Sequence, residues 1–191
     1  PDMHGINGLV AQYGLLALFA GVILEGETVA MTGGVLAHRG LLVVWQVWAV
    51  IAAAAFCSDL GWFFTGRRFG GHPLVQRMMR REGVSRVMAR VHDNPRKLTA
   101  VFRFIPGLRI LGPLALSQSP LTARVYVGMV AVTDCIWSAI FTAAGLGVGA
   151  VLVRLLGGGH RTEHILIGAG VLILAAIAAT WWFYVHRWRR G

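Results

Sequence analysis

Long apolar stretches dominate the chain, and their lengths predict membrane helices. A helix needs about 20 predominantly apolar residues to cross the hydrocarbon core of a bilayer. Three stretches are long enough, at about 41–65, 121–150 and 164–186. Two more, at about 8–37 and 98–119, are apolar but are broken near their middles. The pattern therefore predicts an all-α integral membrane protein.

The two broken stretches have the character of re-entrant hairpins. Residues 25–27, Glu-Gly-Glu, interrupt the first one, and Pro106 and Gly107 interrupt the second. Non-helical backbone is tolerated at membrane depth only where protein or water covers it. Each broken stretch precedes a full span, and paired interrupted segments in two halves of a chain are typical of transporters. We therefore expect two opposed hairpins related as an inverted repeat.

Positive charge predicts the orientation of these elements. The loop 66–97 carries nine Lys and Arg residues, and the C-terminal tail carries Arg187, Arg189 and Arg190. The positive-inside rule places both segments in the cytoplasm. An even number of crossings must then separate them, so 98–119 is expected to enter the membrane and return. Apolar residues at helical spacing within the loop predict amphipathic helices on the membrane surface, with a solvated linker helix as the alternative.

Composition agrees with a membrane protein. Of 191 residues, 56% are hydrophobic and 14% are charged, and the mean hydropathy is +0.64. A soluble domain carries about 25% charged residues. The net charge of +10 lies mostly in loops, which favours contact with anionic lipid headgroups over nucleic acid. We therefore expect a single membrane domain over 1–191.

Two arginines flank the break in the second broken stretch. Arg103 and Arg109 lie in the apolar run "FRFIPGLRILGP", where an unpaired buried charge is costly. A planar guanidinium can donate two hydrogen bonds to one phosphate, so both residues are candidates for binding the phosphate of a lipid headgroup. In the alternative, they staple the hairpins together by pairing with acidic residues of the apolar regions, namely Glu25, Glu27, Asp59 and Asp134.

Half of the eight acidic residues lie in or beside apolar stretches. Glu25 and Glu27 are two residues apart, so their charges repel, and a carboxylate at membrane depth can exchange a proton. These two residues are therefore candidates for coupling to a proton gradient. Asp59 lies near the end of its span, where it is expected to pair with Arg67 or Arg68. Supporting roles are expected of three residues, Asp59, Arg67 and Asp134, the last without a definite partner.

No motif for catalysis or metal binding is convincing. The run "HRTEH" at 160–164 matches the H-x-x-E-H pattern of inverted zinc proteases. However, it follows three glycines, and no Asp or Glu comes after Glu163 to complete the ligands. No P-loop or nucleophile-elbow motif occurs in a usable context. We therefore expect a protein that is not an enzyme and holds no metal or cofactor.

Four segments resemble the DedA family of bacterial membrane proteins. The run "FRFIPGLR" at 102–109 matches the family's R-F-x-P-x-x-R core and the aromatic residue before it. The segments 26–40, 59–70 and 137–149 are similar to its acidic start, its Gly-Arg segment and its Trp-to-glycine ending. The resemblance covers about residues 8–150.

The chain departs from the family pattern at three places. Many members space two acids about a dozen residues apart, whereas here they are compressed into Glu25 and Glu27 with no proline between them. The Ala-Gly that follows the second arginine in the family is replaced around 115–120. Asp134 occupies a position that is normally uncharged.

The resemblance implies a function in lipid transport. It implies two opposed re-entrant hairpins, a place in the bacterial cytoplasmic membrane, and proton-driven movement of undecaprenyl phosphate. By the same resemblance, Arg103 and Arg109 hold the phosphate, and Glu25 and Glu27 handle the proton. Alternatives are a phosphatidylethanolamine flippase or scramblase, a proton-coupled small-ion antiporter, and a structural or regulatory membrane protein. Whether the protein forms a homo-oligomer is left open.

Overall fold

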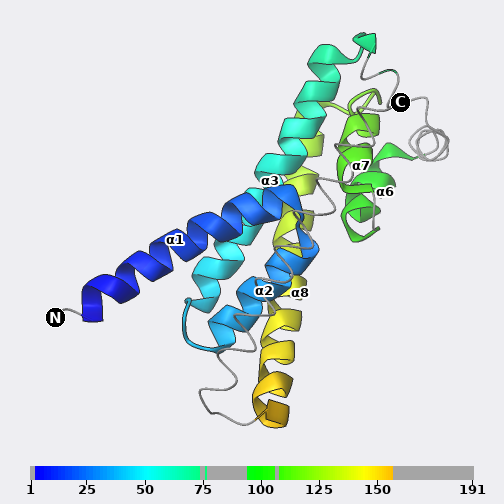
Figure 1. Ribbon diagram of the computed structural model, residues 1–191. Coiled ribbons are helices and arrows are strands. Elements are labelled where there is room, and N and C mark those ends of the chain that lie inside the picture. The colour runs from blue at the N-terminus through cyan, green and yellow to red at the C-terminus, as the bar shows by residue number, and fades with distance from the viewer. Residues whose placement is uncertain (1–2, 74–75, 77–93, 106–107, 157–191) are drawn as a thin grey trace, which may run out of the picture.

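The computed structural model describes residues 3–73, 76, 94–105 and 108–156 (Figure 1). These residues form helices joined by short turns, and no strand occurs among them. Three sequence predictions concern residues outside this part of the chain. They are most of the surface helices in 66–97, the last span at 164–186, and the break residues Pro106 and Gly107.

The first broken stretch forms two helices that meet at Gly26. Helix α1 (Met3–Leu24) ends just before this glycine and α2 (Glu27–His38) begins just after it. Gly26 has a φ of +92°, a backbone conformation that residues with a Cβ rarely adopt. Figure 1 shows that the chain changes direction there. A glycine is therefore required where α1 gives way to α2.

The second broken stretch forms three short helical pieces, α6 (Pro95–Val101), the 3₁₀ turn η1 (Phe102–Phe104) and α7 (Leu108–Leu116). Helix α6 begins where it does because the Asn94 side chain accepts a hydrogen bond from the backbone N–H of Lys97, 3.3 Å away. Proline at the first helical position suits this start. The helical path ends at Ile105, whose backbone is extended.

Each broken stretch leads into a long helix, α3 (Val44–Phe69) in the first half and α8 (Ala123–Leu156) in the second. Among the described residues, these two helices are long and apolar enough to cross a membrane. They run antiparallel, because Trp48 contacts Cys135 at one level and Phe63 stacks on Tyr126 at another. Large apolar side chains on both helices are exposed, including Trp45, Ile136, Ile140 and Val151. This is the surface expected of helices that face lipid.

The interior contains two separate apolar clusters. The first joins α1, α2, the start of α3 and the middle of α8, with Val22, Ile51 and Trp137 among its buried residues. The second joins the end of α3, α6, η1, α7 and the start of α8, with Phe63 and Phe102 among its buried residues. Helices α3 and α8 therefore hold both halves of the described protein together.

Two glycines let α2 approach α8 closely. A Cβ at Gly34 would meet the carbonyl oxygen of Thr142, and a Cβ at Gly145 would meet the carbonyl oxygen of Met31. Small residues allow this kind of backbone approach between membrane helices. The segments 26–40 and 137–149, which contain Gly34 and Gly145, thus face each other in space.

The predicted all-α membrane class is confirmed for the described residues. The order of elements is also the same in both halves, an interrupted stretch followed by a long helix. The re-entrant course of the broken stretches through a bilayer and the inverted repeat stay predictions.

Candidate functional site

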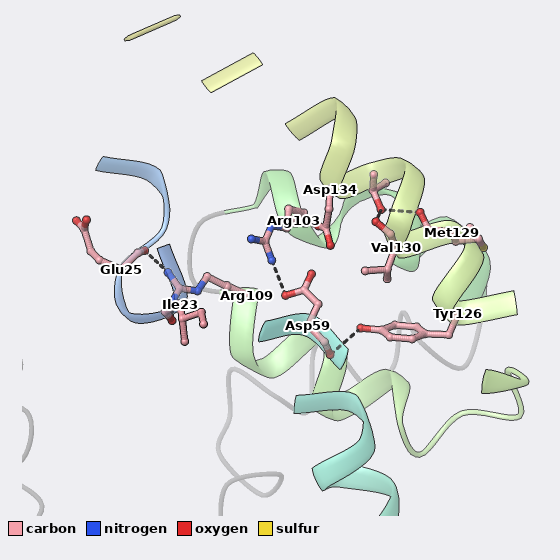
Figure 2. Close-up of polar contacts among 10 residues, drawn as sticks. Ile23, Glu25, Asp59, Arg103, Arg109, Tyr126, Met129, Val130 and Asp134 are labelled. Atoms are coloured by element: carbon pink, nitrogen blue, oxygen red, sulfur yellow. Dashed lines mark hydrogen bonds and ion pairs between the residues drawn. The ribbon is translucent and has the colours of Figure 1, made fainter. Parts of the chain in front are cut away.

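The break between α1 and α2 presents backbone carbonyls to the second half of the protein. The last carbonyls of a helix have no partner within the helix and carry partial negative charge. Arg109, in the first turn of α7, donates from Nη1 to the carbonyl oxygen of Glu25 and from Nη2 to that of Ile23 (Figure 2). A Cβ at Gly26 would collide with the same guanidinium group. Arg109 therefore caps the C-terminus of α1 from another part of the chain.

Arg103, in η1, lies in a fully buried ionic cluster. It forms an ion pair with Asp59 of α3, and its Nε lies 3.4 Å from Oδ1 of Asp134 in α8 (Figure 2). Arg103, Asp59 and Asp134 are 3%, 0% and 1% exposed. The guanidinium carbon also lies 4.6 Å from the ring centroid of Trp137, which is a cation–π contact. The Arg103 guanidinium thus links η1 to both α3 and α8.

Several polar atoms of this site have no hydrogen-bond partner among the described residues. Buried donors and acceptors are usually paired, so a group of unpaired ones marks a place suited to a ligand, proton or water. The cationic donors concerned are Arg103 Nε and Nη2 and Arg109 Nε, and the acidic acceptors are Glu25 Oε2, Asp59 Oδ2 and both carboxylate oxygens of Asp134. The site can therefore take up an anion at its guanidinium groups or a cation at its carboxylates.

Tyr126 lies on the side of the cluster that faces the second apolar core. Its ring stacks on Phe63 with centroids 3.8 Å apart, and its hydroxyl lies 3.4 Å from the backbone carbonyl oxygen of Asp59. Trp137 belongs to the first apolar core. The charged cluster thus lies between the two apolar cores, which shield it from both directions.

The prediction that Asp59 pairs with Arg67 or Arg68 is wrong. Asp59 pairs with Arg103, while the Arg67 guanidinium hydrogen-bonds to the backbone carbonyl oxygens of Ser117, 3.4 Å away, and Leu121. Arg67 follows Asp59 by eight positions of one helix, which is about 12 Å along the axis. Arg67 therefore supports the turn between α7 and α8 and lies apart from the ionic cluster.

The structure brings the two predicted arginines into one region but gives them different partners. Figure 2 shows both guanidinium groups between the Ile23–Glu25 backbone and Asp59. Arg103 pairs with carboxylates, as the stapling alternative requires, whereas Arg109 binds carbonyls. Glu25 and Glu27 flank the α1–α2 break and are half-buried, and both interact electrostatically with Arg109.

Sequence reasoning did not anticipate Trp137 and Tyr126 as neighbours of the ionic cluster. Asp134 and Trp137 are three residues apart on one helix and therefore share a face. That spacing was a usable signal that Asp134 points inward. No comparable signal identified Tyr126, whose position depends on how α3 and α8 pack.

The chain matches the model of the VTT domain over residues 22–147. It is similar to the inner membrane protein YohD of Escherichia coli K12, with 29% identity over 93% of this chain and 92% of the relative. The uncharacterized membrane protein ML0287 of Mycobacterium leprae is 28% identical over 85% of this chain and 73% of its own length.

A third relative is the uncharacterized membrane protein slr0232 of Synechocystis, 33% identical over 60% of this chain and 58% of its own length. No solved structure gives a significant match. The matched region contains α2, α3, both arginines, the acidic residues of the site and most of α8. Because this match covers more than half of its residues, the chain belongs to the VTT-domain, or DedA, family of membrane proteins.

Proposed function

We propose that this protein moves an anionic lipid carrier, undecaprenyl phosphate, across the cytoplasmic membrane, and that the proton motive force drives the movement. The observation that carries the proposal is the meeting of two helix breaks at two arginines, the buried Arg103 and the half-buried Arg109. Charged groups inside a membrane domain are costly and are usually functional. Membership of the VTT-domain family and the membrane names of its relatives support a transporter.

The chemistry of the arginines suits a phosphate. Arg109 is half-buried, and its Nε has no hydrogen-bond partner within the described chain. Arg103 Nη2 is likewise unpaired there, on the other side of the same region. A phosphate oxygen is a strong acceptor for such guanidinium donors. The lipid tails can stay in the bilayer while these donors offer the headgroup a polar path.

The carboxylates give the proposal a way to use protons. Glu25 and Glu27 lie beside Arg109, so their charge state changes the field that a bound phosphate meets. Arg103 is held by Asp59 and lies near Asp134, so phosphate must displace or share those carboxylates. Transport therefore requires the cluster to rearrange during each cycle. The protein needs no enzymatic step and no cofactor for this function.

A second candidate is a structural role in which Arg103 only staples the two halves together. The ion pair of Arg103 with Asp59, next to Asp134, favours it. The two functions predict different effects of replacing Arg103 with lysine. A staple keeps part of its strength with a single ammonium group, whereas a forked phosphate contact does not.

The test measures transbilayer movement of undecaprenyl phosphate in proteoliposomes. Wild type is compared with Arg109→Lys and Arg103→Lys, and Arg68→Lys serves as a control for loss of an arginine elsewhere. Proton-driven movement that Arg109→Lys reduces at least tenfold, in a variant that stays folded, supports the proposal. Absence of movement with this lipid and with phosphatidylethanolamine contradicts it. Movement of phosphatidylethanolamine alone would mean that the protein is a lipid transporter whose substrate is that lipid and not undecaprenyl phosphate.

A further inference from the structure

The buried ionic cluster contains more acidic groups than basic ones. One guanidinium, that of Arg103, faces the carboxylates of both Asp59 and Asp134. Both oxygens of Asp134 and one oxygen of Asp59 have no hydrogen-bond partner among the residues that the structure describes. Keeping two ionised carboxylates on a single cation away from water is unfavourable. A further positive charge, such as a proton or a metal cation, would therefore stabilise the cluster.

The neighbouring elements that the structure describes do not supply that charge. Among the described residues, the other cation that interacts with Asp59 is Arg109 of α7, which is bound to carbonyl oxygens of α1 and also interacts with Glu25 and Glu27. Tyr126 of α8 adds a neutral hydroxyl. Within the described part of the chain, the charged groups facing this region are four carboxylates and two guanidinium groups, from Glu25, Glu27, Asp59, Asp134, Arg103 and Arg109.

Asp134 is the carboxylate best placed to accept the missing charge. Asp59 accepts a hydrogen bond from Arg103 Nη1, whereas Asp134 accepts none from the described residues. Figure 2 shows the Asp134 carboxylate pointing from α8 toward Asp59 and Arg103. A proton on Asp134 would cancel its charge and give it a donor to share with the free oxygen of Asp59.

We propose that Asp134 and Asp59 form a proton-binding site, in which the proton resides on Asp134 and Asp59 remains paired with Arg103. This site is separate from the Glu25 and Glu27 pair at the α1–α2 break. Proton binding forms one O–H bond on a carboxylate and requires no other reactant. The use of this proton in transport rests on the proposed function, but its binding does not.

The site links proton occupancy to the availability of Arg103. With the proton on Asp134, Arg103 is held electrostatically by Asp59 alone. After the proton leaves, two carboxylates hold the same guanidinium. A proton entering the site therefore loosens the hold on Arg103 and favours its contact with an anionic headgroup.

The test is infrared spectroscopy of the full chain in lipid bilayers near neutral pH, where carboxyl groups in contact with water are ionised. A protonated carboxyl group gives a C=O stretch that an ionised one lacks. We expect such a band in wild type, its loss in Asp134→Asn, and its retention in Glu27→Gln and in the conservative Asp134→Glu. Asparagine has nearly the shape of aspartate, and an unchanged amide spectrum checks that the variant is folded.

Other results would overturn the proposal. A band that persists in Asp134→Asn, or that disappears in Glu27→Gln, would place the proton elsewhere. Absence of any protonated carboxyl band in wild type, together with stabilisation by sodium over choline chloride, would assign the missing charge to a metal cation. The measurement uses no transported lipid, so its outcome is independent of whether undecaprenyl phosphate moves.

Discussion

The two helix breaks of this protein differ in what they offer each other. The α1–α2 break offers acceptors, the carbonyl oxygens of Ile23 and Glu25 and the carboxylates beside them. The break around η1 and α7 offers donors, the guanidinium groups of Arg103 and Arg109. Each break alone would leave its polar groups poorly satisfied where protein shields them from water. Together they form a site whose parts come from both halves of the chain.

The long helices also contribute unequally. Helix α3 gives Asp59, which accepts a hydrogen bond from Arg103, while α8 gives Asp134, which forms only a longer ion pair with Arg103, at 3.4 Å, and has no hydrogen bond within the described chain. A structure needed only for stapling would gain nothing from the second carboxylate. This difference agrees with the proposal that Asp134 binds and releases the proton while Asp59 holds Arg103 in place.

The largest expected effect follows from removing the shared cation. Arg103→Leu leaves the Asp59 carboxylate buried without its counter-charge, and should lower the free energy of unfolding by about 3–5 kcal/mol. Thermal unfolding in lipid–detergent micelles measures this loss. Arg68→Leu, which removes a charge from an exposed position of α3, is the control. Equal effects of the two variants would show that the ionic cluster does not hold the halves together.

A smaller effect is expected where α2 meets α8. In Gly145→Ala the new methyl group would collide with the Met31 carbonyl, and should cost about 1–3 kcal/mol of stability. Gly147→Ala in the same helix adds a methyl group to open space and should be neutral or slightly stabilising. Chemical unfolding of both variants measures the difference. A gain in stability for Gly145→Ala would contradict the close approach of the helices.

The contact between the two breaks is tested by a pair of glycines with similar backbone. Gly26 and Gly40 both have positive φ, +92° and +72°, so alanine at either should cost about 1–2 kcal/mol in backbone strain. A Cβ at Gly40 meets nothing within 4 Å, whereas at Gly26 it meets the Arg109 guanidinium. Gly26→Ala should therefore lose more stability, by about 1 kcal/mol for a weakened hydrogen bond. Equal losses would mean that Arg109 does not contact the first break.

Much of the fold could be predicted because membrane helices have strong sequence signals. The apolar length of α3 and α8 and the Glu-Gly-Glu interruption are local features that a single chain reveals. Arg103 and Arg109 were identifiable for the same reason, since a charge in an apolar run is conspicuous. These signals depend on neighbouring residues and on no long-range contact.

The partners of the charged residues could not be predicted in the same way. Asp59 was assigned to the arginines nearest in sequence, but its actual partner is 44 positions away and reaches it through the packing of η1 against α3. Arg109 binds backbone carbonyls, which look the same at every position of a sequence. Asp134 lacked an assignment because its neighbours come from α3 and η1. Such pairings depend on how the halves dock.

The central claim, that charged groups of both halves act as one unit, is tested most directly by a double-mutant cycle. The free energies of unfolding are measured for wild type, Asp59→Asn, Arg103→Gln and the double variant. Each single variant leaves its former partner buried and unpaired, so the double variant should be more stable than the sum of the two losses implies, by about 1–3 kcal/mol. Losses that add to within about 0.5 kcal/mol would show that the two residues do not interact, and would contradict the account.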